Sequence, residues 1–566
     1  MELYKLPHTL KPNGLTKFAF SLILTALSLP LLANKQDQTL VLIGGALTTC
    51  SSFSPQNCRL NSAPSGKKQN NYQLNKMAIS AIAERWPTAN NDAKSATVKS
   101  LTILMANYSQ IMNKSELLWA WRDLDQQQLN QLVDQEYNFV LDMLEQPVLD
   151  ASGQRLKEQV DSAKNSERAA NDILAFIEGA SKVSNATPQL LAITASSRDP
   201  YETADFYEGL LSFEGVSQAW LPLTPALAKA ISRNECSQLN QYREQLMGLY
   251  NREVIYPDRT AAEQALCEKG SANLVTILAA STGLMFNGGD QSLTRQVMFD
   301  EQGNEYPWTE VLRSRPIIIG TSAGTAVQSG GKNTAGQVAM ISNGTSLAAL
   351  REGAFAFNAP SERCLESCPD NLGPDSLTYQ ALGGLGTFNY GILDTHFSER
   401  NRTARLATLL SKTGQNHGFG VDETTALVVV KANKTELMTV VGKHGVVHIQ
   451  TKGQQQKYNY SYWPSGTVID ITKQGFSLSS RTKQAAKAGA DMPALPAQIF
   501  QNILNDAKLR SLTQAMCLSK SSQSQGQHDE FNLSLSAQDS TEYVRVNSHQ
   551  NGCAINELEL MITASQ

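Results

Sequence analysis

The sequence feature that most constrains the fold is a short apolar run that leads into a motif of small residues. Three isoleucines at 317–319 follow Pro316 and precede Gly320-Thr321-Ser322-Ala323-Gly324. β-Branched residues between turn formers predict a buried strand, and the small residues permit a sharp turn into a helix. Such a turn projects the serine Oγ above the sheet and directs the amide of Ala323 toward a developing oxyanion. Because the motif also occurs in ordinary strand-to-helix turns, it predicts a nucleophile only together with its context.

Two later segments supply a base and an acid. His396 ends the apolar segment 391–397, and the candidate acids are Asp394, Asp422 and Glu423. Serine, histidine and a carboxylate form an acyl-transfer triad, in which the histidine takes the serine proton and the acid orients the imidazole. In the α/β-hydrolases the acid precedes the histidine, whereas Asp422 and Glu423 follow it, so that family fits poorly.

Several motifs then occur in a fixed order. They are Leu42-Ile43-Gly44-Gly45, Phe286-Asn287-Gly288-Gly289-Asp290-Gln291, Gly320-Thr321-Ser322-Ala323-Gly324, Asp394-Thr395-His396-Phe397 and Gly420-Val421-Asp422-Glu423-Thr424-Thr425-Ala426-Leu427. Together they resemble cyanophycinase, a branch of the S51 serine peptidases that also contains the aspartyl dipeptidases. The resemblance covers about half of the chain, chiefly 38–50, 188–225 and 274–450.

The resemblance implies an activity and a fold. The expected reaction is cleavage of β-aspartyl-arginine linkages in cyanophycin, a polyaspartate with arginine on its β-carboxyls, through attack of the serine on a β-aspartyl amide carbonyl and an acyl-enzyme. The expected products are β-Asp-Arg dipeptides. The expected core is that of the class I glutamine amidotransferases, a flavodoxin-like sheet.

The resemblance also assigns roles to single residues. It makes Ser322, His396 and Glu423 the triad. The amide of Gly289 or Asp290 would be the oxyanion donor beside Ala323, since glycines at a strand end let the backbone approach a ligand. The residues expected to bind substrate are Gln291, Asp394, Thr395, Arg400, Arg402 and Arg405.

Two positions depart from the family motifs. Thr395 stands where glutamine normally precedes the histidine, and Thr325 stands where alanine normally follows the serine motif. Loss of the long amide removes a substrate contact but leaves the chemistry intact. The alternatives are therefore an aspartyl or isoaspartyl exopeptidase of the same family and a non-catalytic binding protein that retains the cleft.

The start of the chain has the pattern of a secretory signal. Residues 1–33 carry Lys5, Lys11 and Lys17 before an apolar run that ends at Ala33, and an uncleaved anchor is the alternative. A net charge of −4 gives no reason to expect a nucleic-acid partner. We expect a secreted or periplasmic protein with no membrane span after signal removal, acting on a polymeric or small β-aspartyl peptide. A homodimer is left open.

Export makes the eight cysteines interpretable as disulfides. Sequence alone allows about 105 pairings, but the cysteines fall into neighbouring pairs within regions that resemble insertions or extensions. We expect Cys50–Cys58, Cys236–Cys267, Cys364–Cys368 and Cys517–Cys553. No Cys-x-x-Cys pair occurs and the seven histidines are scattered, so we expect no metal, and the chemistry requires no organic cofactor.

The chain of 566 residues is too long for one ordinary core. Alternating strand and helix patterns predict an α/β fold, a mostly parallel sheet with helices on both faces and active residues at the carboxyl ends of its strands. The expected parts are the signal peptide 1–33, the first strand and loop 34–73, a helical insertion 74–187, the catalytic domain 188–490 with insertions near 228–270 and 355–380, and a C-terminal α+β extension 491–566. In the extension we predict a helix over 499–517 and strands over 531–537, 543–547 and 558–562.

Overall fold

The computed structural model describes most of the chain. The described residues are 37–59, 62–182, 187–364, 368, 371–432, 435–453, 456–473, 475–489, 491–547 and 552–565. The predicted signal peptide, residues 1–33, lies outside them. No helix within these ranges is both long and apolar enough to cross a bilayer.

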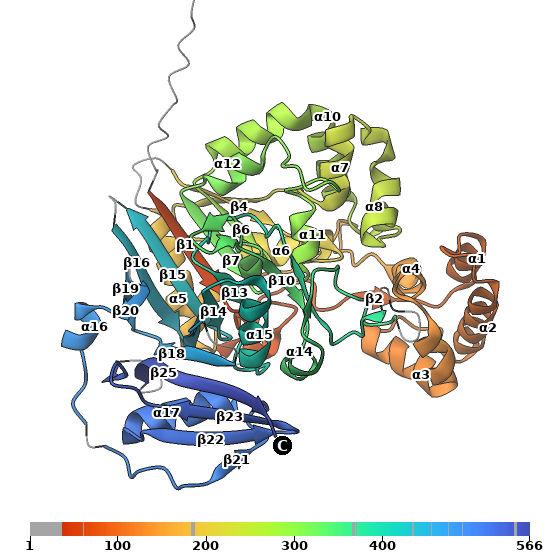
Figure 1. Ribbon diagram of the computed structural model, residues 1–566. Helices are drawn as coiled ribbons and strands as arrows, with labels where there is room; N and C mark the ends of the chain where they lie inside the picture. The colour runs from red at the N-terminus through yellow and green to blue at the C-terminus, as the bar shows by residue number, and fades with distance from the viewer. Residues whose placement is uncertain are drawn as a thin grey trace, which may run out of the picture. The chain divides into compact units, whose positions relative to one another are not determined.

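The centre of the described part is a mixed nine-stranded sheet (Figure 1). Its parallel strands are, in spatial order, β1 (Gln38–Ile43), β7 (Ile317–Thr321), β6 (Gly283–Phe286), β4 (Gln189–Ile193) and β5 (Ser217–Trp220). On the other side of β1 the sheet continues through the antiparallel strands β15 (Thr425–Ala432), β16 (Thr435–Gly442), β19 (Val468–Thr472) and β20 (Gly475–Leu478). Parallel strands with intervening helices confirm the predicted α/β class.

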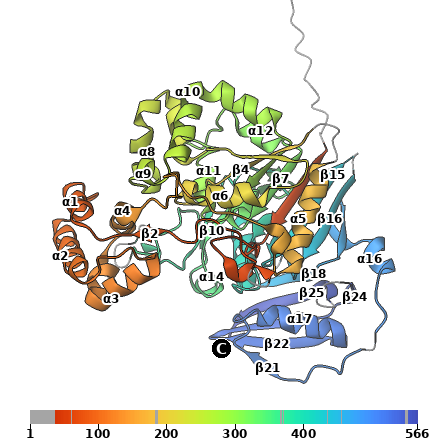
Figure 2. The ribbon, with the colours of Figure 1, turned by 180° about the vertical axis from the view of Figure 1, so that it is seen from behind.

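Side chains along the central strands alternate between two faces of this sheet. Val41 and Ile43 of β1 pack in one core with α5 (Arg168–Ser181) and the end of α6 (Pro200–Leu210). Leu40 and Leu42 pack in the other core with α7 (Pro225–Arg233) and α10 (Pro257–Ala280). Seen from behind, α5 and α6 lie in front of the sheet (Figure 2). The inner parallel strands β1, β7, β6 and β4 are therefore buried on both faces, which explains their apolar sequences, whereas the edge strand β5 is partly exposed.

A second sheet joins part of the region 188–490 to the C-terminal extension. The strands from that region are β13 (Ile392–Asp394), β14 (His417–Val421), β17 (Gly445–Thr451) and β18 (Lys457–Pro464). β18 pairs antiparallel with β25 (Cys553–Ala564), and the sheet goes on through β23 (Phe531–Ser536), β22 (Gln523–His528) and β21 (Ile499–Gln501), with β24 (Glu542–Arg545) on the free part of β25. The extension thus continues a sheet whose edge strand β13 ends two residues before His396.

The helix predicted over 499–517 is wrong in its first half. The helix α17 spans Lys508–Ser519, whereas Ile499–Gln501 form β21, which pairs with β22, and turns connect the two elements. Asn502, Asp506 and Ala507 each have φ of 53°, which a right-handed helix does not tolerate. The edge pairing satisfies backbone groups that a helix would otherwise satisfy internally, so a long-range contact overrides the local pattern.

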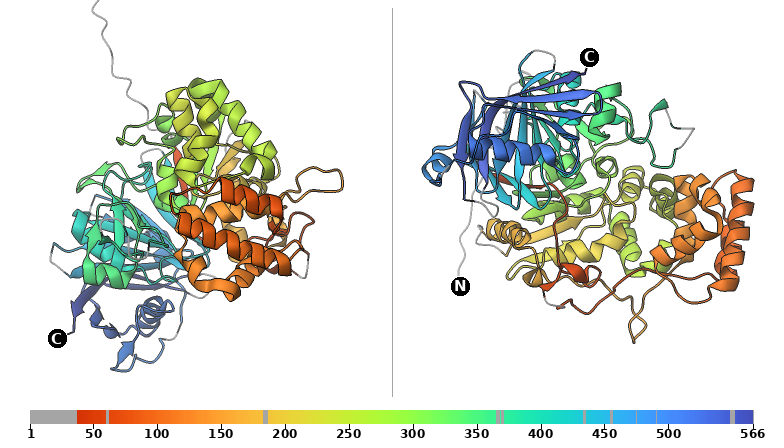
Figure 3. Two further views of the ribbon diagram at one scale, coloured as in Figure 1. Left: turned by 90° about the vertical axis from the view of Figure 1, so that its right-hand side faces the viewer. Right: turned by 90° about the horizontal axis from the view of Figure 1, so that it is seen from below.

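The first four helices form a bundle with a core of its own. They are α1 (Lys76–Glu84), α2 (Asn91–Asn107), α3 (Lys114–Gln131) and α4 (Asp134–Leu144), and Figure 3 shows them packed side by side. Trp121 and Phe139 are fully buried inside this bundle. Although α5 also falls within 74–187, it packs on the main sheet instead.

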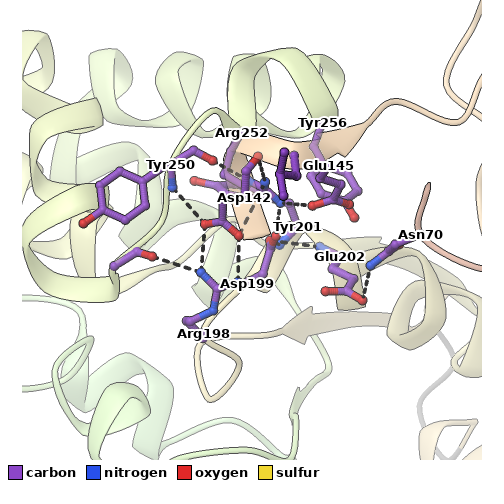
Figure 4. Close-up of polar contacts among 12 residues, drawn as sticks. Asn70, Asp142, Glu145, Arg198, Asp199, Tyr201, Glu202, Tyr250, Arg252 and Tyr256 are labelled. Atoms are coloured by element: carbon purple, nitrogen blue, oxygen red, sulfur yellow. Dashed lines mark hydrogen bonds and ion pairs between the residues drawn. The ribbon is translucent and has the colours of Figure 1, made fainter. Parts of the chain in front are cut away.

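A buried charge cluster ties the bundle to the main domain (Figure 4). Arg252, only 1% exposed, contacts Glu145 and Asp199 at 2.7 Å each, and Arg198 binds both carboxylate oxygens of Asp142 at 2.9 Å. Asp199 also caps α6 by accepting two backbone N–H groups. Because α6 lines the pocket described below, the cluster couples the bundle to that wall of the pocket.

The disulfide prediction is confirmed. The structure pairs the cysteines as Cys50–Cys58, Cys236–Cys267, Cys364–Cys368 and Cys517–Cys553. Cys517 lies on α17 and Cys553 on β25, so the last bridge fixes that helix to the shared sheet.

Candidate active site

Ser322 lies in the turn between β7 and the short helix α13 (Ala323–Ala326). Its φ of 53° and ψ of −116° are values that non-glycine residues rarely adopt, and such strain is concentrated at functional sites. A Cβ at Gly324 would lie 2.1 Å from the carbonyl oxygen of Phe286, so this turn packs against the end of β6 only with glycine there. The local geometry is that of a nucleophile elbow.

Ser322, His396 and Glu423 form a continuous hydrogen-bonded chain. Ser322 Oγ lies 2.8 Å from His396 Nε2, and His396 Nδ1 lies 2.7 Å from Glu423 Oε1. With the Nδ1 proton donated to the carboxylate, Nε2 is left to accept the serine proton. The serine follows β7, the histidine follows β13 and the glutamate follows β14. The structure therefore brings together the three residues that the sequence motifs singled out.

The main chain of the first strand end holds the imidazole in place. The amide of His396 donates to the Gly44 carbonyl at 2.7 Å, and a Cβ at Gly45 would lie 2.3 Å from His396 Cε1. His396 itself has φ of 47°, so the backbone is strained at the base as well as at the serine. The glycine pair thus forms a wall against which the ring lies.

The surroundings of His396 favour its neutral form by lowering its pKa. Burial lowers the pKa of His396, and the charges of Arg400 and Arg402 lower it further, although the hydrogen bond that His396 Nδ1 donates to Glu423 raises it. A neutral imidazole is the form that can accept a proton. The electrostatics of the site therefore suit a general base.

The segment predicted to hold an oxyanion lies directly beside the serine. A Cβ at Gly288 would be 3.2 Å from Ser322 Cβ, and the Gly288 amide donates to Tyr207 Oη at 3.2 Å. The Asp290 amide donates to the Ser196 carbonyl at 2.7 Å, whereas Gly289 lines the pocket. Of the two alternative oxyanion donors, the Asp290 amide is thus already hydrogen-bonded within the fold.

Ser322 and His396 open into a pocket of about 420 Å³. One wall comes from α6 and the neighbouring strand end, and it is largely apolar. Arg400 adds a positive charge, which suits a carboxylate group. The full lining is Ala46, Leu47, Phe206, Tyr207, Leu210, Met285, Gly288, Gly289, Thr321, Ser322, His396 and Arg400.

Two of the predicted substrate residues form an internal ion pair instead of lining this pocket. Arg405 Nε donates to Asp394 Oδ2 at 2.8 Å, and the two side chains are 4% and 1% exposed. Another Arg405 nitrogen donates to the Gly344 carbonyl. Burial raises the pKa of Asp394, but Arg405 and Arg402 outweigh it and hold the pKa below its ordinary value. This pair supports the segment that follows His396.

The other predicted substrate residues differ in whether they are engaged inside the fold or line the pocket. Arg402 Nη1 donates to the Thr395 carbonyl at 2.6 Å, and burial, with Arg405 next, lowers the pKa of Arg402 to about 9. Thr395 is itself 4% exposed. Gln291 Nε2 donates to the carbonyls of Ile341 and Ser342 at 2.7 and 3.0 Å, which fastens α11 (Gln291–Arg295) to β10 (Met340–Asn343). Arg400 is the predicted arginine that lines the pocket.

With this geometry established, the comparisons with known proteins can be stated. No family model matches the chain. The chain is similar to cyanophycinases. It is 27% identical over 200 residues to one from Synechococcus elongatus, across 35% of this chain and 49% of that protein. It is 24% identical over 266 residues to one from Nostoc sp., across 46% of this chain and 73% of that protein.

The match to the Synechococcus cyanophycinase spans about half the length of that protein. A third cyanophycinase, from Geminocystis herdmanii, is 40% identical over 75 residues, which is 13% of this chain and 26% of that protein. A solved structure described as a peptidase from an acI-B1 actinobacterium aligns over 54% of this chain and 93% of that one, with 16% identity and a TM-score of 0.28.

Sequence reasoning missed two parts of the site. Phe206 and Tyr207 of α6 line the pocket, but an aromatic pair on a helix carries no signal beyond ordinary packing. Arg510 of α17 contacts Asp422, which is 88 residues away in the sequence, and no motif marks it. Among the described residues, no group of three or more histidine, cysteine or acidic side chains is placed to hold a metal ion.

Proposed function

We propose that the protein is an exported serine-type peptidase of the cyanophycinase kind that releases β-Asp-Arg dipeptides from cyanophycin. The observation that carries the proposal is the hydrogen-bonded chain from Glu423 through His396 to Ser322 at the base of a pocket. The similarity to curated cyanophycinases supports the substrate class.

In the proposed mechanism His396 Nε2 takes the proton of Ser322 as Oγ attacks a carbonyl carbon of the substrate. The amides of Gly289 and Ala323 hold the resulting oxyanion. His396 then gives its proton to the leaving amine and the C–N bond breaks. In the second half, His396 takes a proton from water as the water oxygen attacks the acyl carbon, and it then gives that proton to Ser322 Oγ as the bond between Oγ and the acyl carbon breaks, which releases the acid product. Glu423 stabilises the imidazolium in both halves.

The expected product indicates which bond of cyanophycin is cleaved. Release of intact β-Asp-Arg requires cleavage of the peptide bond between successive backbone aspartates, because attack on the β-amide would release free arginine instead. We therefore place the attack at the backbone carbonyl, which corrects the β-aspartyl amide carbonyl expected from the motifs. The arginine attached to the β-carboxyl then remains on the product.

The deciding experiment incubates the purified mature protein with insoluble cyanophycin and follows soluble products by mass spectrometry. We expect β-Asp-Arg from the parent and none from Ser322→Ala. Labelling by a fluorophosphonate probe reports on the nucleophile independently of the substrate. A probe-reactive parent that releases no dipeptide refutes cyanophycin as the substrate, and a folded parent that does not label refutes the serine mechanism in favour of a binding protein.

One observation favours a second candidate, an aspartyl or isoaspartyl exopeptidase. Thr395 replaces the glutamine of the family motif, and it is buried, with its backbone N–H donating to Asp394 Oδ1 at 2.8 Å. A short peptide needs fewer contacts than a polymer does. Release of the terminal residue from isoaspartyl peptides, with no dipeptide from cyanophycin, identifies this activity.

Export and a flavodoxin-like core complete the proposal. Four disulfides support an oxidising location, which is secreted or periplasmic, and detection of the mature protein in the periplasmic or external fraction of an expressing cell tests this. The flavodoxin sheet has the strand order 2-1-3-4-5. If β4, β5, β6 and β7 are counted as strands 1 to 4, their spatial order β5-β4-β6-β7 is 2-1-3-4, and β1 occupies the fifth position. Ligands of such sheets bind at the carboxyl ends of the strands, where Gly289 and Ser322 lie.

A further inference from the structure

An arginine from the C-terminal extension contacts two carboxylates that adjoin Glu423, the proposed acid of the triad. Arg510, on α17, places Nη1 3.0 Å from Asp422 Oδ2 and also contacts Glu399 Oε1. The Arg510 side chain is 15% exposed. Asp422 immediately precedes Glu423, and Glu399 Oε2 accepts the backbone N–H of Glu423 at 3.0 Å. The guanidinium therefore bridges the two carboxylates that border the third triad residue.

The two carboxylates need a counter-ion in order to remain charged. Burial raises the pKa of Asp422 to about 6, and the charge of Glu399 adds to this, while Arg510 opposes both. Burial also raises the pKa of Glu399, but Arg510 outweighs it and holds that pKa below its ordinary value. Like charges in a buried site repel each other, so Arg510 is the group that makes the arrangement stable.

The start of the same helix also contacts the segment that follows His396, because the Ala507 amide donates to Asn401 Oδ1 at 3.1 Å. That segment is joined in turn to Asp422, whose Oδ1 accepts the Ser398 amide at 2.9 Å. The Cys517–Cys553 bridge anchors α17 to β25, which is paired with β18 of the catalytic region. The position of Arg510 is therefore fixed by a disulfide and by a shared sheet.

We propose that Arg510 is a positioning residue for the reaction, so that the C-terminal extension completes the active site; the inference rests on the proposed function. By bridging Glu399 and Asp422, it holds the Glu423 backbone and thereby aims the Glu423 carboxylate at His396. A histidine that loses this orientation keeps its chemistry but no longer presents Nε2 to Ser322.

Loss of the Arg510 charge has a defined electrostatic sign. It leaves more negative charge beside the Glu423–His396 pair, which favours the imidazolium and raises the pKa of His396. The acid limb of the pH–rate profile then moves to higher pH. The other charged or titratable groups that face this region are Arg400, Arg402, Glu423, His444, Tyr460 and Tyr462.

The test compares Arg510→Gln with a control, Lys508→Gln. The control removes a positive charge from the same helix, but Lys508 Nζ lies 4.0 Å from the exposed Asp506 Oδ2 and not beside the triad. The full mature chain is labelled with a fluorophosphonate over a range of pH, and release of β-Asp-Arg is measured in parallel. We expect Arg510→Gln to label about tenfold more slowly or worse, with its acid limb at higher pH, and Lys508→Gln to behave as the parent. A parent-like rate and pH profile for Arg510→Gln overturns the inference.

Other outcomes remain informative. If Arg510→Gln does not fold, the double variant Arg510→Gln/Asp422→Asn removes one charge of each sign. It relieves the repulsion between Asp422 and Glu399, but Glu399 still lacks its contact with Arg510. We expect this variant to fold and to label slowly, and parent-like labelling overturns the inference. A parent that labels but releases no dipeptide refutes the substrate alone, and a parent that does not label overturns both proposals.

Discussion

Substitution of Gly45 by alanine tests whether the end of β1 positions His396, the proposed catalytic base. Gly45 has φ of 110°, and an added Cβ would lie 2.3 Å from His396 Cε1 and 2.4 Å from Nε2. Real carbon–carbon contacts in proteins are about 3.5–4.0 Å, so the ring must move by about 1 Å or more. That displacement breaks the 2.8 Å contact between His396 Nε2 and Ser322 Oγ.

The structure separates the effect on catalysis from the effect on stability. A displacement of about 1 Å in a catalytic group can cost about 100-fold in rate. A non-glycine residue at this backbone conformation costs about 1–3 kcal/mol of stability. Gly336→Ala is the matched control, because Gly336 has φ of 108° and no atom lies within 4 Å of its added Cβ. The control carries the backbone strain without the contact with His396.

The assay combines the rate of fluorophosphonate labelling with the midpoint of thermal unfolding. We expect both variants to lose a similar amount of stability, and only Gly45→Ala to label about 100-fold more slowly. Labelling of Gly45→Ala at the rate of Gly336→Ala refutes the reasoning, because the ring then tolerates a Cβ at that position without leaving the serine.

Two further predictions concern charge. Because burial, with the charges of Arg400 and Arg402, holds the pKa of His396 below its ordinary value, kcat/KM is expected to stay on its plateau at neutral pH and to fall only at acid pH, as the imidazole is protonated. Arg400→Met removes a charge that lowers this pKa, so the acid limb should move to higher pH, and a limb that stays in place or moves lower contradicts the assignment. Arg252→Met leaves Glu145 and Asp199 buried without their counter-ion and should cost about 3–5 kcal/mol in urea unfolding. Arg85→Met, at the exposed pair with Glu244, should cost less than about 1 kcal/mol, and equal midpoints for the two variants contradict the stabilising role of the cluster.

The sequence by itself determined the features that depend on short-range chemistry. The isoleucine run and the small residues around Ser322 predicted a buried strand and a sharp turn, because both follow from the steric preferences of neighbouring residues. The disulfides joined the nearest cysteines, with separations of 4 to 36 residues. The alternation of strands and helices indicated the α/β class for the same reason.

Only the tertiary structure decided what depends on distant contacts. The local pattern of 499–517 favoured a helix, but pairing of β21 with β22 replaced its first half. The motifs named Asp394 and Arg405 as substrate contacts, yet burial paired them with each other, because an unpaired charge inside the fold is costly.

The proposed triad acid shows the same division. Neighbouring positions 422 and 423 both offered a carboxylate, and in the turn after β14 Glu423 contacts His396 whereas Asp422 contacts Arg510. Arg510 lies 111 residues from Glu399 and 88 from Asp422, and no local pattern links them. The sequence supplied the chemical groups, and the shared sheet that joins β18 to β25 decided which of them meet, because the contact requires both segments to fold onto one another.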